Sequence, residues 1–131
     1  MYKTFYGLEI NPFVKELKTE YCFESKDFNE VKGRLNYLKE IKGIGLFIGS
    51  SGLGKTYTIR CFIDGLNKDM YKVIYISPTG KLRTFEFFAE IANALNIDTG
   101  NCYKNTLYDR IQVEIKRLVN EKRIQPIIII D

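Results

Sequence analysis

The residues best suited to chemistry lie in one short, glycine-rich stretch near the middle of the chain. Glycine lets a backbone turn tightly, so Gly49, Gly52 and Gly54 can bring their N–H groups close to phosphate oxygens. Lys55 would supply a positive charge to the β- and γ-phosphates of a nucleotide, and the hydroxyl of Thr56 is suited to Mg²⁺. The whole stretch fits the pattern G-x-x-x-x-G-K-[ST] of a phosphate-binding loop and reads Gly49-Ser50-Ser51-Gly52-Leu53-Gly54-Lys55-Thr56.

The segments on either side of this loop favour the same interpretation. An apolar run from Ile44 to Ile48 predicts a strand before it, and the pattern from Ile59 to Leu66 predicts a helix after it, running to about Asn67. The positive N-terminal end of such a helix attracts an anion. The alternative is a plain strand-to-helix turn, which has no need for the glycines, the lysine and the threonine together. We therefore expect the loop and the adjoining Tyr57 to bind a nucleotide.

Length, composition and charge bound the class of protein. The 131 residues, 45% of them hydrophobic and 27% charged, predict one globular domain with its own core. No run reaches the length of a membrane-spanning helix and the N-terminus lacks a secretion signal, so we expect a cytoplasmic protein. The net charge of +4 is compatible with nucleic-acid contact and equally with none. A late helical pattern carries a basic face, which could touch nucleic acid but is more often solvated: Arg110, Lys116, Arg117, Lys122 and Arg123.

The absence of histidine excludes several classes of enzyme mechanism. Hydrolysis by a serine or cysteine with a histidine base, and zinc catalysis on histidine ligands, are excluded. Cys22, Cys61 and Cys102 are widely spaced and form no C-x-x-C pair, which predicts reduced, mostly buried thiols. Chemistry must therefore come from a cofactor, a metal ion, carboxylates or the phosphate-binding loop.

Strand and helix patterns alternate along the chain, which predicts a parallel α/β sheet with right-handed crossovers. A helix is expected from Phe28 to Ile41, with Ser25 or Asp27 as its N-cap and Lys42-Gly43 at its end. A strand is expected at Val73–Ile76, followed by a helix from Phe85 to Leu95 that is capped by Thr84. The last expected helix is long and is capped by Thr106 in a capping box with Asp109.

The last residues, Pro126 to Asp131, predict a second part of the nucleotide site. Four consecutive isoleucines are too apolar for a half-exposed strand and predict a central parallel strand covered on both faces. An acid at the end of such a strand can hold Mg²⁺ through its water shell. Roughly 75 residues after the loop in a β-α-β-α pattern, Asp131 is therefore expected to bind the metal together with Thr56.

The first 13 residues are rich in aromatic side chains but follow no helical or alternating pattern. This predicts an extended arm held by its rings. Either the rings pack beside the adenine of a bound nucleotide, or they close the bottom of the core. The candidates for the first alternative are Phe5, Leu8 and Phe13.

Together these residues resemble the AAA+ ATPases, with Gly49 to Thr56 as the Walker A loop and Ile127 to Asp131 as Walker B. The opening, Tyr2 to Leu8 followed by Asn11-Pro12-Phe13, is similar to two narrower groups. One is the ATP-binding transposition helpers of bacterial mobile elements, and the other is the general secretion pathway protein A ATPases. The resemblance implies a P-loop NTPase fold of the AAA+ type, a three-layer α/β sandwich with a parallel central sheet. It would span residues 1–131, with an aromatic arm at 1–24 and a nucleotide-binding core at 25–131.

The resemblance also implies the ligands and partners. ATP and Mg²⁺ would be the cofactors, with Lys55 and Asp131 serving catalysis, Thr56 and Asp131 holding the metal, and the arm near the adenine. The implied partners are ATP or ADP, further copies in a homo-oligomer, double-stranded DNA and a transposase. The alternatives are an envelope assembly of the secretion branch, or a nucleotide-dependent assembly switch that does not hydrolyse ATP.

One departure from the family pattern shapes these expectations. In the family the Walker B aspartate is followed by a glutamate that polarises the attacking water, and here the sequence stops at Asp131. We therefore expect an amino-terminal fragment, incomplete at its C-terminus, that binds nucleotide without efficient hydrolysis. In the family's sheet a later strand lies between the Walker A and Walker B strands, so we expect exposed apolar edges or a strand recruited from another copy.

Overall fold

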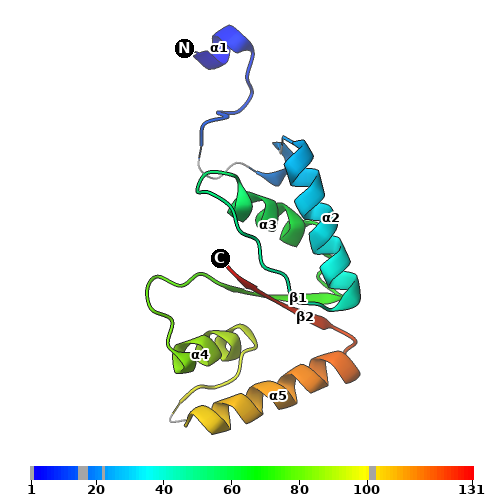
Figure 1. Cartoon of the computed structure of the whole chain (residues 1–131), viewed down its shortest axis with the longest axis vertical. Helices are drawn as coiled ribbons and strands as arrows, with labels where there is room; N and C mark the ends of the chain where they lie inside the picture. The colour runs from blue at the N-terminus through cyan, green and yellow to red at the C-terminus, as the bar shows by residue number, and fades with distance from the viewer. Residues whose placement is uncertain (1, 15–17, 22, 101–102) are drawn as a thin grey trace. The chain divides into compact units, whose positions relative to one another are not determined.

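The computed structural model describes residues 2–14, 18–21, 23–100 and 103–131 (Figure 1). These residues form two compact units, Met1–Asp64 and Gly65–Asp131, which we call the N-terminal unit and the C-terminal unit. The phosphate-binding loop belongs to the first unit and Asp131 to the second.

The N-terminal unit consists of helices and connecting segments. Its elements are α1 (Tyr2–Tyr6), the 3-10 turn η1 (Thr19–Tyr21), α2 (Lys26–Ile41) and α3 (Lys55–Asp64). Helix α2 packs against α3, and Phe28 on α2 and Phe62 on α3 are both buried. The predicted helix at α2 is confirmed, and its N-cap is Ser25 rather than Asp27, because the Ser25 side chain accepts a hydrogen bond from the Phe28 N–H at 3.1 Å.

The expected extended arm is wrong at its beginning, where the chain forms the short helix α1. Gly7 follows this helix with a φ of 62°, a left-handed conformation that suits glycine. This conformation lets the Leu8 N–H donate to the Lys3 carbonyl at 2.8 Å, the bond that closes a helix end. The aromatic rings contact one another locally, since Tyr2 and Phe13 have centroids 5.9 Å apart in an edge-to-face arrangement.

The strand expected before the loop is also absent from the described residues, because no strand is assigned between residues 43 and 50. Ile44, Leu46 and Ile48 are 101%, 83% and 88% exposed. The backbone here runs against α2, since a Cβ at Gly45 would lie 2.2 Å from Leu38 Cδ1. An apolar run becomes a strand only by pairing with a neighbour, and the sheet among the described residues contains only β1 and β2.

The C-terminal unit is a parallel pair of strands with two helices. It contains β1 (Tyr71–Ile76), α4 (Thr84–Ala94), α5 (Lys104–Asn120) and β2 (Gln125–Ile130). The strands pair in register from Tyr71 opposite Gln125 to Ile76 opposite Ile130, which confirms the predicted parallel arrangement. Helix α4 packs against β1, α5 packs against β2, and the helices contact each other. They enclose a core of Ile74, Ile76, Ile91, Ala92, Leu95, Leu107, Ile111 and Leu118.

The three later helices differ from the sequence prediction at their ends. Helix α3 ends at Asp64, short of Asn67. Helix α4 has Arg83 rather than Thr84 at its N-cap position, and the Arg83 N–H donates to Glu86 Oε2 at 3.1 Å. Helix α5 begins at Lys104 with Tyr103 at its N-cap, so Thr106 lies inside the first turn and does not cap it. The fully buried Leu107 belongs to that same turn, and its N–H donates to the Tyr103 carbonyl at 3.0 Å, so burial outweighs the capping preference.

The coverage predicted for the isoleucine strand is wrong as well. Ile128 and Ile130 of β2 are 43% and 57% exposed, so this strand is not covered on both faces. Its exposure follows from its place in a sheet of two strands, where it has one strand neighbour. The predicted burial of the thiols is confirmed at Cys61, whose thiol is buried, whereas Cys22 and Cys102 lie outside the described residues.

Candidate functional site

The predicted phosphate-binding loop leads directly into the first turn of α3. Gly52 and Gly54 have φ values of 84° and 79°, in the left-handed region that favours glycine. Helix α3 then begins at Lys55, so its first backbone N–H groups lie next to the loop. Thr58 holds this junction, because its N–H and its side-chain Oγ1 both donate to the Gly54 carbonyl, at 2.9 and 3.0 Å. The backbone thus provides the N–H groups and helix end that bind anions in proteins.

The side chain of Lys55 lies back over the loop. Its Nζ donates to the carbonyl oxygens of Gly49 and Ser50, both at 2.8 Å. An ammonium group has three N–H donors, so these two bonds leave capacity for one more acceptor. A phosphate could therefore approach the ammonium with the loop bonds intact, or take their place. Either way the charge is already held at the loop.

The structure brings the loop residues and Tyr57 together as one continuous loop and helix start. Ser50, Ser51, Leu53 and Thr56 are exposed, whereas Lys55 and Tyr57 are partly buried. Thr56 is exposed and adjoins Lys55, a position that is compatible with a Mg²⁺ that also binds phosphate oxygens. Thr58 was missed by the sequence analysis, although its position three residues after Lys55 is that of a residue bonding back to the start of a helix.

Asp131 follows β2 in the C-terminal unit. Its backbone N–H donates to the Ile76 carbonyl at 3.0 Å, and its Oδ2 accepts a hydrogen bond from the Tyr75 hydroxyl at 2.5 Å. Tyr75 was not predicted from the sequence. The predicted parallel pairing of the two strands could have indicated Tyr75, because this pairing places a polar side chain of β1 beside the acid that follows β2. The pairing of Asp131 with Thr56 around a metal stays a prediction.

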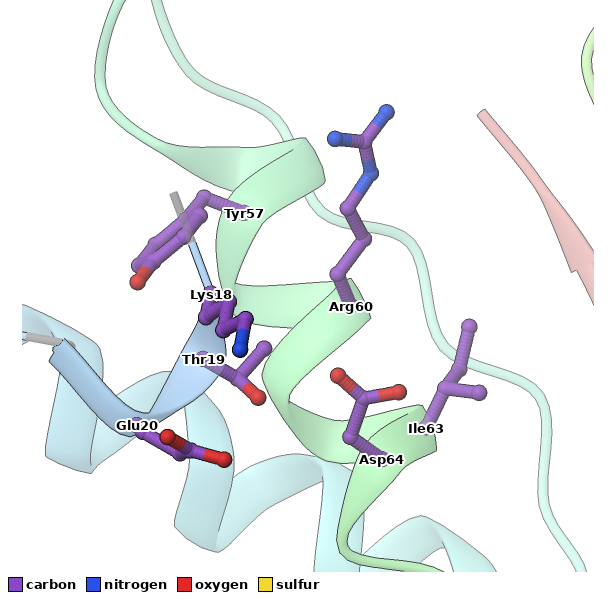
Figure 2. A pocket seen from close by; sticks show the side chains of 7 residues that line it. All are labelled: Lys18, Thr19, Glu20, Tyr57, Arg60, Ile63 and Asp64. Carbon is purple, nitrogen blue, oxygen red and sulfur yellow. The ribbon is translucent and has the colours of Figure 1, made fainter. Parts of the chain in front are cut away.

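A pocket of about 440 Å³ lies along α3 in the N-terminal unit (Figure 2). A volume of this order is typical of small-molecule sites. Tyr57 is the one lining residue that the sequence analysis predicted, and Phe5, Leu8 and Phe13 of the arm do not line it. The spacing of the residues from α3 could have predicted a shared helix face. The pocket is lined by Lys18, Thr19, Glu20, Tyr57, Arg60, Ile63 and Asp64.

Comparison with protein families assigns the chain to a known class. The family model described as AAA domain matches residues 39–131. The chain belongs to this AAA domain family. The match includes the phosphate-binding loop and Asp131, and it implies the P-loop NTPase fold and nucleotide binding, because AAA domains generally bind ATP with Mg²⁺. No curated protein and no solved structure gave a match.

The AAA match begins within α2, so the aromatic arm at residues 1–24 lies outside it. The narrower resemblance to transposition helpers or secretion-pathway ATPases therefore stays a prediction, as does the division into an arm and a core. Among the described residues, no helix is long and apolar enough to cross a membrane.

The residues present fit ATP and Mg²⁺ as ligands of this AAA domain. The loop combines left-handed glycines, an ammonium group bonded to the loop carbonyls and an exposed threonine at the start of a helix. In the parts of the chain that the structure describes, no three His, Cys, Asp or Glu side chains gather as a metal site. Mg²⁺ binds proteins through one or two side chains together with water and nucleotide phosphates, and Thr56 offers one such side chain.

Proposed function

We propose that this AAA domain binds ATP with Mg²⁺ in the loop from Gly49 to Thr56. The observation that carries the proposal is the junction of loop and helix, where two left-handed glycines are followed at once by α3 with Lys55 as its first residue. Backbone N–H groups of the loop and helix end bind the phosphates, and Lys55 neutralises charge on the β- and γ-phosphates.

Thr56 and Asp131 hold the metal in this proposal, Thr56 through its hydroxyl and Asp131 through water. Bound Mg²⁺ would neutralise the negative charge that develops on the phosphate oxygens during phosphoryl transfer. Lys55 contributes to the same task, because its ammonium lies at the loop carbonyls and needs little rearrangement to meet a phosphate.

The pocket beside α3 receives the base and ribose of the nucleotide in this proposal. Tyr57 supports this placement because it lies two residues after Lys55 and also lines the pocket. Its ring offers an apolar face for stacking with a base. Thr19, Glu20 and Asp64 bring hydroxyl and carboxylate oxygens to the lining, which are suitable partners for ribose hydroxyls.

The decisive test is the variant Lys55→Ala, with ATP binding measured by isothermal titration calorimetry in the presence of Mg²⁺. Removing one partner of a charged, hydrogen-bonded pair should weaken ATP binding by at least about thirtyfold. The matched control is Lys68→Ala, which removes an exposed lysine outside the loop and should bind ATP as the wild type does. Wild-type affinity in a folded Lys55→Ala variant would overturn the site assignment.

We further propose that ATP binding drives assembly on double-stranded DNA in the service of a transposase. The support is the aromatic opening, Tyr2 to Leu8 with Asn11-Pro12-Phe13, which is similar to the transposition helpers. A basic surface offers further support, although it is smaller than the sequence suggests. On and just after α5, Lys116, Lys122 and Arg123 are exposed. The other two basic residues are engaged within the protein, since Arg117 pairs with Glu114 and Arg110 donates to the Asp98 carbonyl.

The test of this narrower function is fluorescence anisotropy of a labelled DNA duplex titrated with the full-length protein. We expect binding that requires a slowly hydrolysed ATP analogue and weakens as salt is added, because phosphate contacts release counterions. The Lys55→Ala variant should lose the dependence on nucleotide. Intact ATP binding without any DNA binding would instead favour a protein partner, as in the secretion branch or in an assembly switch.

A further inference from the structure

A hydrogen bond joins the two strands of the C-terminal unit next to the acid predicted to hold the metal. The Tyr75 hydroxyl on β1 donates to Oδ2 of Asp131, just after β2, at a distance of 2.5 Å. These residues are 56 positions apart in the sequence, so the contact depends on the strand pairing. The function proposed above gives Tyr75 no role.

The register of the strands explains why this contact forms. Tyr75 is opposite Ile129 in the parallel pair, and side chains two residues apart on a strand share a face, so Tyr75 and Asp131 lie on the same face. The neighbours of Tyr75 on β1, Ile74 and Ile76, face the opposite way and are 0% and 3% exposed in the core. Tyr75 itself is 39% exposed. Its ring is therefore held on a strand that the core anchors, while its hydroxyl reaches the acid.

We propose that Tyr75 is a positioning residue that orients the Asp131 carboxylate toward Mg²⁺. This inference rests on the proposed role of Asp131 as a metal-binding residue. A phenol that donates a hydrogen bond to one oxygen of a carboxylate restricts the rotation of that carboxylate and so favours one orientation. A hydrogen-bonded partner of this kind restricts a metal-binding side chain before the metal binds, so that less rotational freedom is lost on binding. Removing such a partner commonly weakens metal affinity.

The test is a double-mutant cycle in the full-length protein, built from Tyr75→Phe and Asp131→Ala. The quantity measured is the ratio of the ATP dissociation constants without and with Mg²⁺, obtained by calorimetry. Tyr75→Phe keeps the ring and removes only the donor, and we expect it to reduce the Mg²⁺ enhancement about tenfold. In the Asp131→Ala background the same change should have no effect. Tyr103→Phe, which alters a tyrosine that is 85% exposed, is the matched control and should behave as the wild type.

Each outcome of this cycle separates the inference from the function on which it rests. If Asp131→Ala keeps the wild-type Mg²⁺ enhancement, the proposed metal-binding role of Asp131 is wrong. If Asp131→Ala loses the enhancement while Tyr75→Phe retains it, the role of Asp131 stands and the positioning role of Tyr75 is wrong. An equal loss from Tyr75→Phe in both backgrounds would also overturn the inference, because a tyrosine that merely supports the fold acts independently of Asp131.

Discussion

The two units of this AAA domain are organised by different kinds of interaction. In the C-terminal unit, side chains from both helices and from β1 meet in one core that extends from Ile74 to Leu118 along the chain. In the N-terminal unit, the conformation around the proposed ATP site rests on bonds between residues close in sequence. Examples are Lys55 with the Gly49 carbonyl and Thr58 with the Gly54 carbonyl.

This difference separates stability from binding within one chain. Burying apolar side chains supplies most of the free energy that opposes unfolding, so changes in the C-terminal core should act mainly on stability. A loop held by local bonds contributes little to that free energy, but it determines where the backbone N–H groups and the lysine lie. Changes there should act mainly on nucleotide affinity.

The largest effect is expected from Leu107→Ala in α5. Leu107 is 0% exposed within the core, so its truncation should lower the free energy of unfolding by about 3 kcal/mol. The matched control on the same helix is Val113→Ala, whose side chain is 67% exposed, and its effect should stay within about 0.5 kcal/mol. Urea denaturation followed by circular dichroism measures both. Equal effects of the two substitutions would mean that the core around Leu107 does not hold the unit together.

A smaller effect, and one on binding rather than stability, is expected from Gly54→Ala in the loop. Gly54 has a φ of 79°, and an L-residue in that region costs about 1 to 2 kcal/mol, so ATP affinity should fall at least about fivefold. No atom lies within 4 Å of the added Cβ, so the cost comes from the backbone.

The matched control for that change is Gly33→Ala in the middle of α2. Here too no atom lies within 4 Å of the added Cβ, but the backbone is helical. We expect this substitution to stabilise the protein by about 0.5 to 1 kcal/mol, because alanine loses less conformational freedom in a helix, and to leave ATP affinity unchanged. Wild-type ATP affinity in Gly54→Ala would show that the left-handed conformation is not needed for binding.

The same contrast decides how much could be predicted from the sequence. The loop and the helix that follows it depend on residues within a few positions of one another, and the pattern predicted them, while it left Ser25 and Asp27 as alternative caps of α2. The parallel pairing of β1 with β2 was also predictable, because alternating strand and helix patterns leave few arrangements. The match to the AAA domain family covers the loop and both strands.

Several of the errors concern features that depend on distant residues. The apolar run from Ile44 to Ile48 has the composition of a strand, but composition does not provide a partner strand. The capping residue predicted at Thr106 was wrong because burial of Leu107 determines the first turn of α5. The pocket residues Lys18 and Thr19 come from a segment without a motif, and the bond from Tyr75 to Asp131 exists only through strand register.

The smallest expected effect tests whether a surface pair adds to the C-terminal unit beyond its core. Arg117 on α5 donates to both carboxylate oxygens of Glu114, at 2.9 and 2.6 Å. This hydrogen bonding is the main cause that holds the pKa of Glu114 below its ordinary value of 4.5. A carboxyl group whose pKa is lower in the folded state than in the unfolded state stabilises the fold at pH values above its ordinary pKa. This contribution is lost as the pH falls through the pKa of the folded state.

The variant Glu114→Gln should therefore be slightly less stable than the wild type at neutral pH, and the difference should vanish as the pH falls well below 4.5. Exposed pairs contribute little, and salt screens them, so the difference should also shrink in concentrated salt. Glu90→Gln on α4 is the control, since Glu90 is exposed and forms no ion pair seen among the described residues. Urea denaturation across the pH range measures both variants. If Glu114→Gln is as stable as the wild type at neutral pH and low salt, the stability of this unit comes from its core and not from the pair.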